Sequence, residues 1–275
     1  MSAGRSAGFS AIELLVGMGL AMLAMAASSS LFLASRGFMQ DQALEVETTH
    51  AARSALDTLA RDLRLGGACL PVTGQFVSLD GVDYGTTDEI ITRTGVTRGD
   101  LSCVRTATAD VTPASAGSIH VESAAGFAVG MRAYIRHTDG SGEFFTVTSV
   151  DTGSNTIGRN ASLLRDYPAT SGVYAVDERH YRVDTSGSRP VLTLQLGAGE
   201  IRPFATGIEA LDVKYELKRN CPPCDVLDLP TGAEWSKVDQ ILVSVTARSA
   251  TTNRAGLSYR RTFTVGVKPR NLLPQ

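Results

Sequence analysis

The hydrophobic pattern divides the chain into an N-terminal part with helical periodicity and a longer part with strand-like alternation. From Leu14 to Ser35 the sequence LLVGMGLAMLAMAASSSLFLAS carries no charged residue. As an α-helix this segment is roughly 33 Å long at about 1.5 Å per residue. The hydrocarbon core of a bilayer is roughly 30 Å thick. The pattern therefore predicts a membrane-spanning helix.

A second helical pattern follows without a clear stop. Phe38 to Leu65 contains no Pro and no Gly, and it carries an apolar stripe at 4-3-4 spacing, formed by Ala52, Leu56, Leu59 and Leu63. Charged residues are placed on the other faces, at Glu45, Glu47, Arg53, Asp57, Arg61, Asp62 and Arg64. Gly66-Gly67 is a typical helix end, whereas Ser28–Ser30 and Gly37 are weak helix formers at which the helix can bend. We predict one long helix whose first half contacts lipid or other helices and whose second half packs on a sheet.

Beyond residue 66 short alternating segments and turn residues predominate, which predicts an antiparallel β domain. Asp139-Gly140-Ser141-Gly142 is a hairpin signal between two such segments. The stretch at about 113–164 has its own rhythm of strands and turns and predicts an inserted β module. The fold class is therefore α+β. Strands are predicted at 88–93, 117–122, 131–137, 143–150, 156–158, 173–183, 190–195, 211–217, 241–248 and 258–267.

Composition excludes several functional classes. The formal net charge is −2 and the basic residues are dispersed, so we expect no nucleic-acid partner. Nucleotide-binding, serine-hydrolase and zinc-protease motifs are absent from the sequence, and the four histidines are scattered, so we expect no enzyme, no metal and no cofactor. The Asp/Gly/Ser turns at 139–143 and 151–155 do not follow the calcium-loop pattern and are interpreted as hairpin turns.

All four cysteines lie beyond the apolar segment, at Cys69, Cys103, Cys221 and Cys224. If that part of the chain is exported, disulfides are permitted. Four cysteines allow three pairings. We favour Cys69–Cys103 with Cys221–Cys224, the second of which encloses only Pro222 and Pro223. A redox role for this C-P-P-C sequence is disfavoured because its flanks lack the helix start that such sites use.

The start of the chain combines three features that rarely occur together. A short leader with one charge, MSAGRSAG, ends in Gly8; Phe9 follows; and Glu13 is the fifth residue counted from Phe9. A carboxylate at the edge of an apolar span costs about 2.5–3.5 kcal/mol on insertion scales, so it needs a partner or a purpose. The segment GFSAIELLV resembles the type IV prepilin signature. A plain signal anchor is the alternative interpretation.

The resemblance implies a processing and assembly pathway. Residues 1–8 would be a leader removed by a prepilin peptidase between Gly8 and Phe9, after which Phe9 is N-methylated. Residues 9–35 would be the transmembrane and assembly half of the helix, 36–66 its amphipathic periplasmic half, and 67–275 the periplasmic β domain. Glu13 would pair with the terminal amine of a neighbouring subunit and set the register of the filament. The usual proline in the first half of the helix is absent.

The C-terminal part carries a looser resemblance. ARDLRLGG, IEALDVKYE, WSKVDQILVSV and RRTFTVGVKPRN look like minor pilins of the PilW type and like the J-type minor pseudopilins of type II secretion. This implies a subunit that initiates, primes or caps a type IV pilus. Its partners would be other minor pilins, the major pilin, the peptidase and the inner-membrane assembly platform. A pseudopilus-tip subunit and an adhesion or DNA-uptake binding module are the alternatives.

Overall fold

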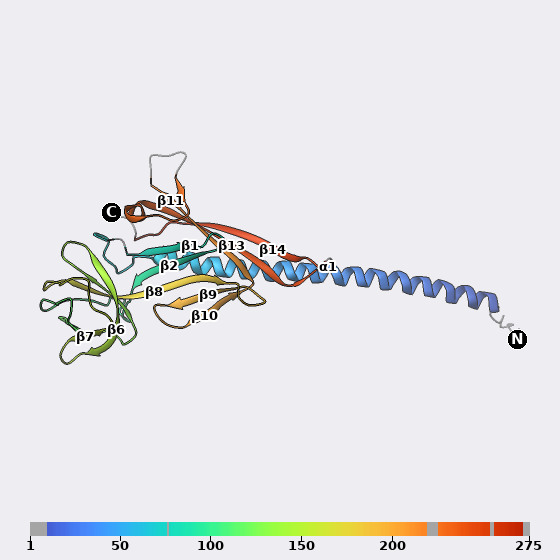
Figure 1. The fold of residues 1–275 in the computed structure, drawn as a ribbon. Helices are drawn as coiled ribbons and strands as arrows, with labels where there is room; N and C mark the ends of the chain where they lie inside the picture. The colour runs from blue at the N-terminus through green and yellow to red at the C-terminus, as the bar shows by residue number, and fades with distance from the viewer. Residues whose placement is uncertain (1–9, 76, 219–224, 254–255, 272–275) are drawn as a thin grey trace. The chain divides into compact units, whose positions relative to one another are not determined.

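The computed structural model describes residues 10–75, 77–218, 225–253 and 256–271 (Figure 1). The chain forms one long helix, α1 (Ala11–Leu65, 55 residues), followed by antiparallel strands. Two compact units are present, Met1–Glu47 with Ser249–Tyr259 and Thr48–Arg248 with Arg260–Gln275. The predicted fold class, α+β with a long N-terminal helix packed on antiparallel sheets, is confirmed.

Helix α1 is continuous through the weak positions named from the sequence. Residues Ser28 to Ser30 and Gly37 all lie in α-helix, and the Ser30 hydroxyl donates a hydrogen bond of 2.8 Å to the Ala27 carbonyl. The helix ends at Leu65, where Gly67 adopts a positive φ of 81°, a conformation that glycine tolerates and that commonly ends helices. The predicted stop at Gly66-Gly67 is therefore confirmed.

The larger unit contains a 10-stranded sheet built around β8 (Gly172–Asp184). The first part of β8 pairs with β3 and β5, and its last part pairs with β2 and β9. The main order is β1-β2-β8-β5-β6-β7-β4, and β10 pairs with β9. The other bounds are β1 Leu79–Asp83, β2 Asp88–Gly95, β3 Arg105–Ala107, β4 Ser118–His120, β5 Arg132–Arg136, β6 Gly142–Asp151, β7 Thr156–Arg159, β9 Val191–Leu196 and β10 Ile201–Thr206.

A second sheet has four strands in the order β12-β11-β13-β14. Its bounds are β11 Ile208–Leu217, β12 Val226–Leu227, β13 Val238–Thr252 and β14 Ser258–Val267. A short 3₁₀ helix, η1 (Gly232–Lys237), precedes β13 and begins with a capping box between Thr231 and Glu234. This sheet contacts the larger one where the Val213 amide donates a 2.6 Å hydrogen bond to Asp88.

The principal core lies where α1 and both sheets meet. The predicted stripe Ala52, Leu56, Leu59 and Leu63 is buried there, and Leu59 and Leu63 have no exposed surface. Full burial of one leucine side chain contributes about 1.5–3 kcal/mol. The sheets add inward-facing residues, chiefly from β11 and β13, namely Ile208, Leu211, Val213, Tyr215, Leu217, Val238, Ile241, Val243, Val245 and Ala247. The second half of α1 is thus part of the domain core.

A second core lies in the region predicted as an inserted β module. Strands β4 to β7 fall within 113–164, but β5 also pairs with β8 and so joins the larger sheet. The buried cluster draws residues from Val104 to Ala175 and is centred on Ile135, Phe145 and Ile157. This part of the chain has its own hydrophobic cluster while sharing the backbone hydrogen bonds of the main sheet.

Each of the ten strands predicted from alternation is found, with ends shifted by up to a few residues. The predicted hairpin at 139–142 joins β5 and β6, and the His137 amide donates to the Ser141 carbonyl at 2.7 Å. Four strands were missed, namely β1, β3, β10 and β12. Three of these have only five residues or fewer, and β10 contains Pro203 beside a register shift.

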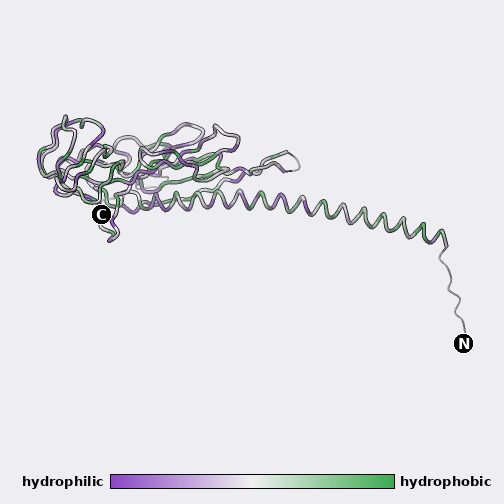
Figure 2. Tube along the Cα trace, turned by 90° about the horizontal axis from the view of Figure 1, so that it is seen from below, coloured by the Kyte–Doolittle hydropathy of each residue, from purple (hydrophilic) through white to green (hydrophobic). Residues whose placement is uncertain are grey.

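The smaller unit consists of the first part of α1 and the tip of the β13–β14 hairpin. Figure 2 shows hydrophobic residues along the N-terminal part of α1 and a mixture of hydrophobic and hydrophilic residues further along it. From Ser10 to Ala43 every residue except Gly37 is exposed. This half of the helix therefore has almost no protein contact within the described chain.

Candidate functional site

The uncharged part of α1 is the first candidate site. Among the described residues, α1 is the one helix that is long and apolar enough to cross a membrane. Its large side chains are exposed on all sides, for example Leu15 at 74%, Met25 at 71% and Leu31 at 72%. A helix that is apolar all round requires lipid or other helices as its surroundings. The surface from Leu14 to Ser35 is therefore incomplete in an isolated subunit.

Glu13 lies in the first turn of this helix and takes part in a capping box. The Ser10 backbone N–H donates to Glu13 Oε2 at 3.4 Å, and the Ile12 N–H donates to Ser10 Oγ at 3.3 Å. These two bonds satisfy backbone donors that no helix carbonyl can reach. In a single chain the Glu13 carboxylate thus stabilises its own helix start. Gly8 and Phe9, the predicted cleavage site, lie outside the described residues.

Asp62 corrects the sequence analysis, which placed it with the charged residues on the outer faces of the helix. It is 6% exposed and points to β8, where the Tyr181 hydroxyl and Arg179 Nη1 donate to Asp62 Oδ2, the latter at 2.9 Å. Arg179 also donates two bonds to Asp177, at 2.8 and 3.1 Å. Burial, and then the hydrogen bond to Asp62, raises the pKa of Tyr181. The charge is buried because a hydroxyl and a guanidinium both bind it, and this polar clamp ties α1 to β8.

A second charged network lies between β2 and β8. Arg93 Nε donates to Glu178 Oε2 at 2.5 Å, and the Arg93 guanidinium carbon lies 4.7 Å from the centre of the Phe144 ring. Arg132 contacts the same ring, at 5.5 Å, and lies 3.7 Å from Glu178. Burial opposes ionisation of Glu178, but the hydrogen bonds from His180 and Arg93 and the nearby guanidinium charges outweigh it and lower its pKa to about 2. Glu178 is therefore a buried anion beside two guanidinium groups and the His180 imidazole.

His180 bridges two carboxylates in this network. Its Nδ1 lies 2.8 Å from Glu89 and its Nε2 lies 3.2 Å from Glu178. The hydrogen bond to Glu178 raises the pKa of His180, burial opposes the shift, and the bond to Glu89 adds to it. The sequence analysis counted His180 only among the four scattered histidines, because its partner Glu89 is far away in the sequence.

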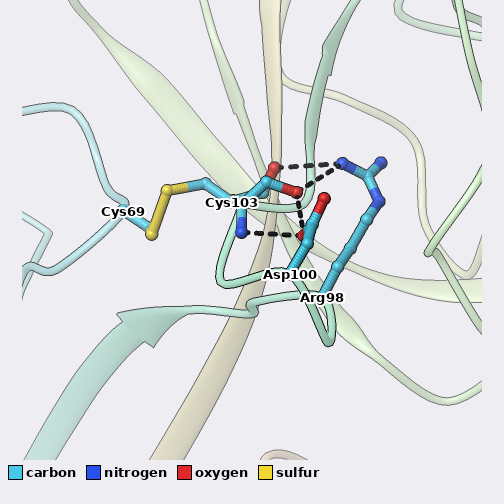
Figure 3. The surroundings of a disulfide bond; sticks show 5 residues. Cys69, Arg98, Asp100 and Cys103 are labelled. Carbon is cyan, nitrogen blue, oxygen red and sulfur yellow. Dashed lines mark hydrogen bonds between the residues drawn. A yellow bond between two sulfur atoms is a disulfide. The ribbon is translucent and has the colours of Figure 1, made fainter.

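The predicted disulfide between Cys69 and Cys103 is present, with a Cα–Cα distance of 5.5 Å. It joins the turn after α1 to the loop between β2 and β3 (Figure 3). Gly95 lies against Cys69, since a Cβ added there would come within 2.5 Å of the Cys69 Cβ. Cys221 and Cys224, the second predicted pair, lie outside the described residues.

The loop that carries Cys103 is fixed by local hydrogen bonds. Arg98 donates to the Cys103 carbonyl at 3.4 Å (Figure 3). Arg98 also donates to the Ala125 carbonyl at 2.9 Å, and Asp100 accepts from both the amide and the hydroxyl of Ser102. The Ser102 hydroxyl, followed by its amide, lowers the pKa of Asp100. The disulfide therefore closes onto a turn that is already ordered, and its contribution is to hold the helix end on the sheet.

Comparison with known proteins finds no matching family model and no matching curated protein. A solved structure that it resembles is a type IV-like pilin from Thermus thermophilus, with 13% sequence identity and a TM-score of 0.36. The likeness covers 84% of this chain and 97% of that chain. Because identity and TM-score are both low, a function must be inferred from the residues of this chain.

The first prediction concerns the disulfide. Replacing both Cys69 and Cys103 with Ala should lower the free energy of unfolding by about 2–4 kcal/mol, because the bond closes a long loop of the unfolded chain. Denaturant titration of the full chain in detergent, followed by the fluorescence of Trp235, measures this. Reductant should shift the parent in the same direction and shift the double variant, which keeps only Cys221 and Cys224, by less. A double variant as stable as the parent would refute a structural role.

The second prediction concerns pH. The pKa of His180 is raised in the folded state. Its contribution to the free energy of unfolding is therefore fully present below the unfolded-state pKa of about 6.5, and it is lost as pH rises through the folded-state pKa. The stability advantage of the parent over His180→Gln should therefore shrink with rising pH in this window. Thermal unfolding at several pH values tests this. His120→Gln is the control, because His120 pairs with Asp110 at the surface, where ion pairs contribute little. A His180→Gln difference that does not change with pH contradicts the assignment.

Proposed function

We propose that this chain is a minor pilin that helps to initiate, prime or cap a type IV pilus. The observation that carries the proposal is the Leu14–Ser35 surface of α1, which is apolar and exposed on all sides. The same helix continues without a break to Leu65, and its second half is buried in the β domain. A filament of packed helices supplies the missing contacts. The second half of α1 belongs to the β domain, because Leu59 and Leu63 lie in its core.

In this proposal α1 has two successive environments. Before assembly the Leu14–Ser35 segment spans the inner membrane once, with the N-terminus in the cytoplasm and the β domain in the periplasm. The single leader charge, Arg5, agrees with retention of the N-terminal end in the cytoplasm. The prepilin peptidase acts before assembly, at the bond between Gly8 and Phe9. During assembly the Leu14–Ser35 segment leaves lipid for the helices of other pilins, with the assembly platform as a partner.

A type II secretion pseudopilus tip is the alternative within the same machinery, since the C-terminal resemblance covers both systems. The long, elaborated β region between residues 67 and 275 agrees with both assignments. A pilus-tip adhesion or DNA-uptake module is an alternative of another class. The balanced charge of the chain argues against DNA as a ligand.

The third prediction concerns processing. Co-expression with a prepilin peptidase should remove residues 1–8, expose Phe9 as the new N-terminus and allow its N-methylation. Intact-mass and N-terminal peptide spectrometry measure this. Gly8→Val is the matched control, because it blocks the small-residue site and leaves the apolar helix unchanged. An unprocessed Met1 start in the presence of active peptidase would overturn the prepilin assignment.

The fourth prediction separates the two roles of Glu13. Glu13→Gln removes the charge but keeps an acceptor for the Ser10 N–H, since both Glu and Gln occur at this position of capping boxes. Glu13→Ala removes both. If the carboxylate pairs with the terminal amine of a neighbour, both variants should be inserted and processed, and both should reduce assembly by about tenfold or more, because the amine would be buried without a partner.

Co-purification with partner pilins and a count of filaments measure assembly, and membrane fractionation measures insertion. If Glu13→Gln assembles like the parent while Glu13→Ala does not, the role of Glu13 is helix capping. If both assemble like the parent, the charge has no role in assembly and the chain is better described as an anchored β domain.

A further inference from the structure

The described residues at the end of the β13–β14 hairpin, 249–253 and 256–259, belong with the first part of α1 to the smaller unit, and some of them lie beside α1; these residues are called the hairpin tip. Two hollows of about 300 and about 320 Å³ separate the hairpin tip from the helix, and both are lined by Asp41, Leu44 and Asn253. Phe38 and Tyr259 contribute aromatic walls to the second hollow. Gly37, one turn before Asp41, is buried although its neighbours on the helix are exposed. The hairpin tip therefore follows the helix along the turns from Gly37 to Glu45.

These turns come directly after the uncharged segment. Ser35 is its last residue, so Phe38 lies roughly 4–5 Å and Leu44 roughly 13–14 Å further along the axis at about 1.5 Å per residue. The polar headgroup region of a bilayer adds about 5–8 Å on each side of the hydrocarbon core. If Leu14–Ser35 fills the hydrocarbon core, the hairpin tip lies at the level of the headgroups and just outside them.

The residues at this level have the composition of a membrane interface. Phe38 and Met39 are 65% and 64% exposed although they lie beyond the uncharged segment, and Leu257 on the hairpin is 65% exposed. Arg36 is exposed at the end of the segment, and Tyr259 lies on the hairpin side. Aromatic and basic side chains are enriched where membrane proteins cross the headgroup region. Exposed apolar residues that gather in one place mark an interaction surface.

We propose that the end of the β13–β14 hairpin, at residues 256–259, is a second membrane contact, in which Leu257 and Phe38 enter the headgroup layer. This inference rests on the proposed spanning role of α1. The partner is the lipid surface of the bilayer that α1 crosses, with Arg36 placed to bind lipid phosphates. The contact holds the hairpin at the bilayer until the subunit is extracted, so leaving the membrane requires removal of Leu257 from lipid as well as removal of the helix.

Tryptophan scanning in vesicles tests the proposal on the full chain. Leu257→Trp reports the hairpin tip, Met25→Trp reports the middle of the apolar segment, and Leu164→Trp, at a residue that is 89% exposed in the larger unit, is the control. Each variant is reconstituted in phosphatidylcholine vesicles whose acyl chains carry bromine either near the headgroup or near the chain end. The parent, with Trp235 as its single tryptophan, supplies the background emission.

Leu257→Trp should lose emission to bromine near the headgroup more than to bromine at the chain end, with a blue-shifted maximum, whereas Leu164→Trp should lose none. Met25→Trp should be quenched most by bromine at the chain end. Quenching at Met25→Trp without quenching at Leu257→Trp would overturn the hairpin contact and leave the membrane anchor intact. Absence of quenching at Met25→Trp would overturn the spanning helix itself. Circular dichroism and an intact Cys69–Cys103 bond confirm that each variant is folded.

Discussion

The structure depends on one constraint, namely that a single uninterrupted helix must satisfy two different surroundings. Its second half buries Leu59 and Leu63 completely among the strands, and its first half exposes an apolar surface on every side. Backbone hydrogen bonds within the helix make this possible, because a helix satisfies its own polar groups in lipid, in water and in a protein core alike.

Apolar burial alone does not determine how the helix sits on the sheet, because alanine and leucine positions along a stripe tolerate small shifts. The clamp of Asp62 with Tyr181 and Arg179 is directional. A shift of α1 by one turn would leave the Asp62 charge buried without its donors, which costs far more than a repacked methyl group. The disulfide from Cys69 to Cys103 closes the same end of the helix onto the sheet. Both features hold the second half of α1 in one register on the sheet.

Much of this arrangement could be predicted from the sequence because periodicity is a local signal. The stripe from Ala52 to Leu63 and the alternating strands follow from residue spacing alone, and Cys69–Cys103 was favoured from cysteine arithmetic. The buried charges could not be predicted in this way. Asp62 falls among charged residues along the helix, and only the fold brings Tyr181 and Arg179 to it. His180 likewise acquires Glu89 through strand pairing.

The missed strands have a related cause. The sequence of β1, LDGVD, contains residues that disfavour strands, but Leu79 pairs with Thr92 and is buried in the core. Tertiary burial therefore overrides local propensity there. Pro203 interrupts the alternation of β10, which lies at an edge where a missing backbone donor is tolerated.

The capping box changes how Glu13 should be understood in assembly. In an isolated chain its carboxylate already accepts the Ser10 N–H, so a bond to a neighbour's terminal amine adds to or replaces an existing interaction. A carboxylate has two oxygens and about four acceptor sites, and one of these is used by Ser10. The same group can therefore hold the helix start and bind an amine together, provided that the neighbour approaches from the open side of the first turn. A residue that is satisfied within its own chain can enter the membrane edge at a lower cost than a bare carboxylate, and it still retains acceptor sites for a partner. In the proposed function, Ser10 would keep one acceptor of Glu13 occupied before assembly, and the remaining acceptors would bind the amine of a second subunit.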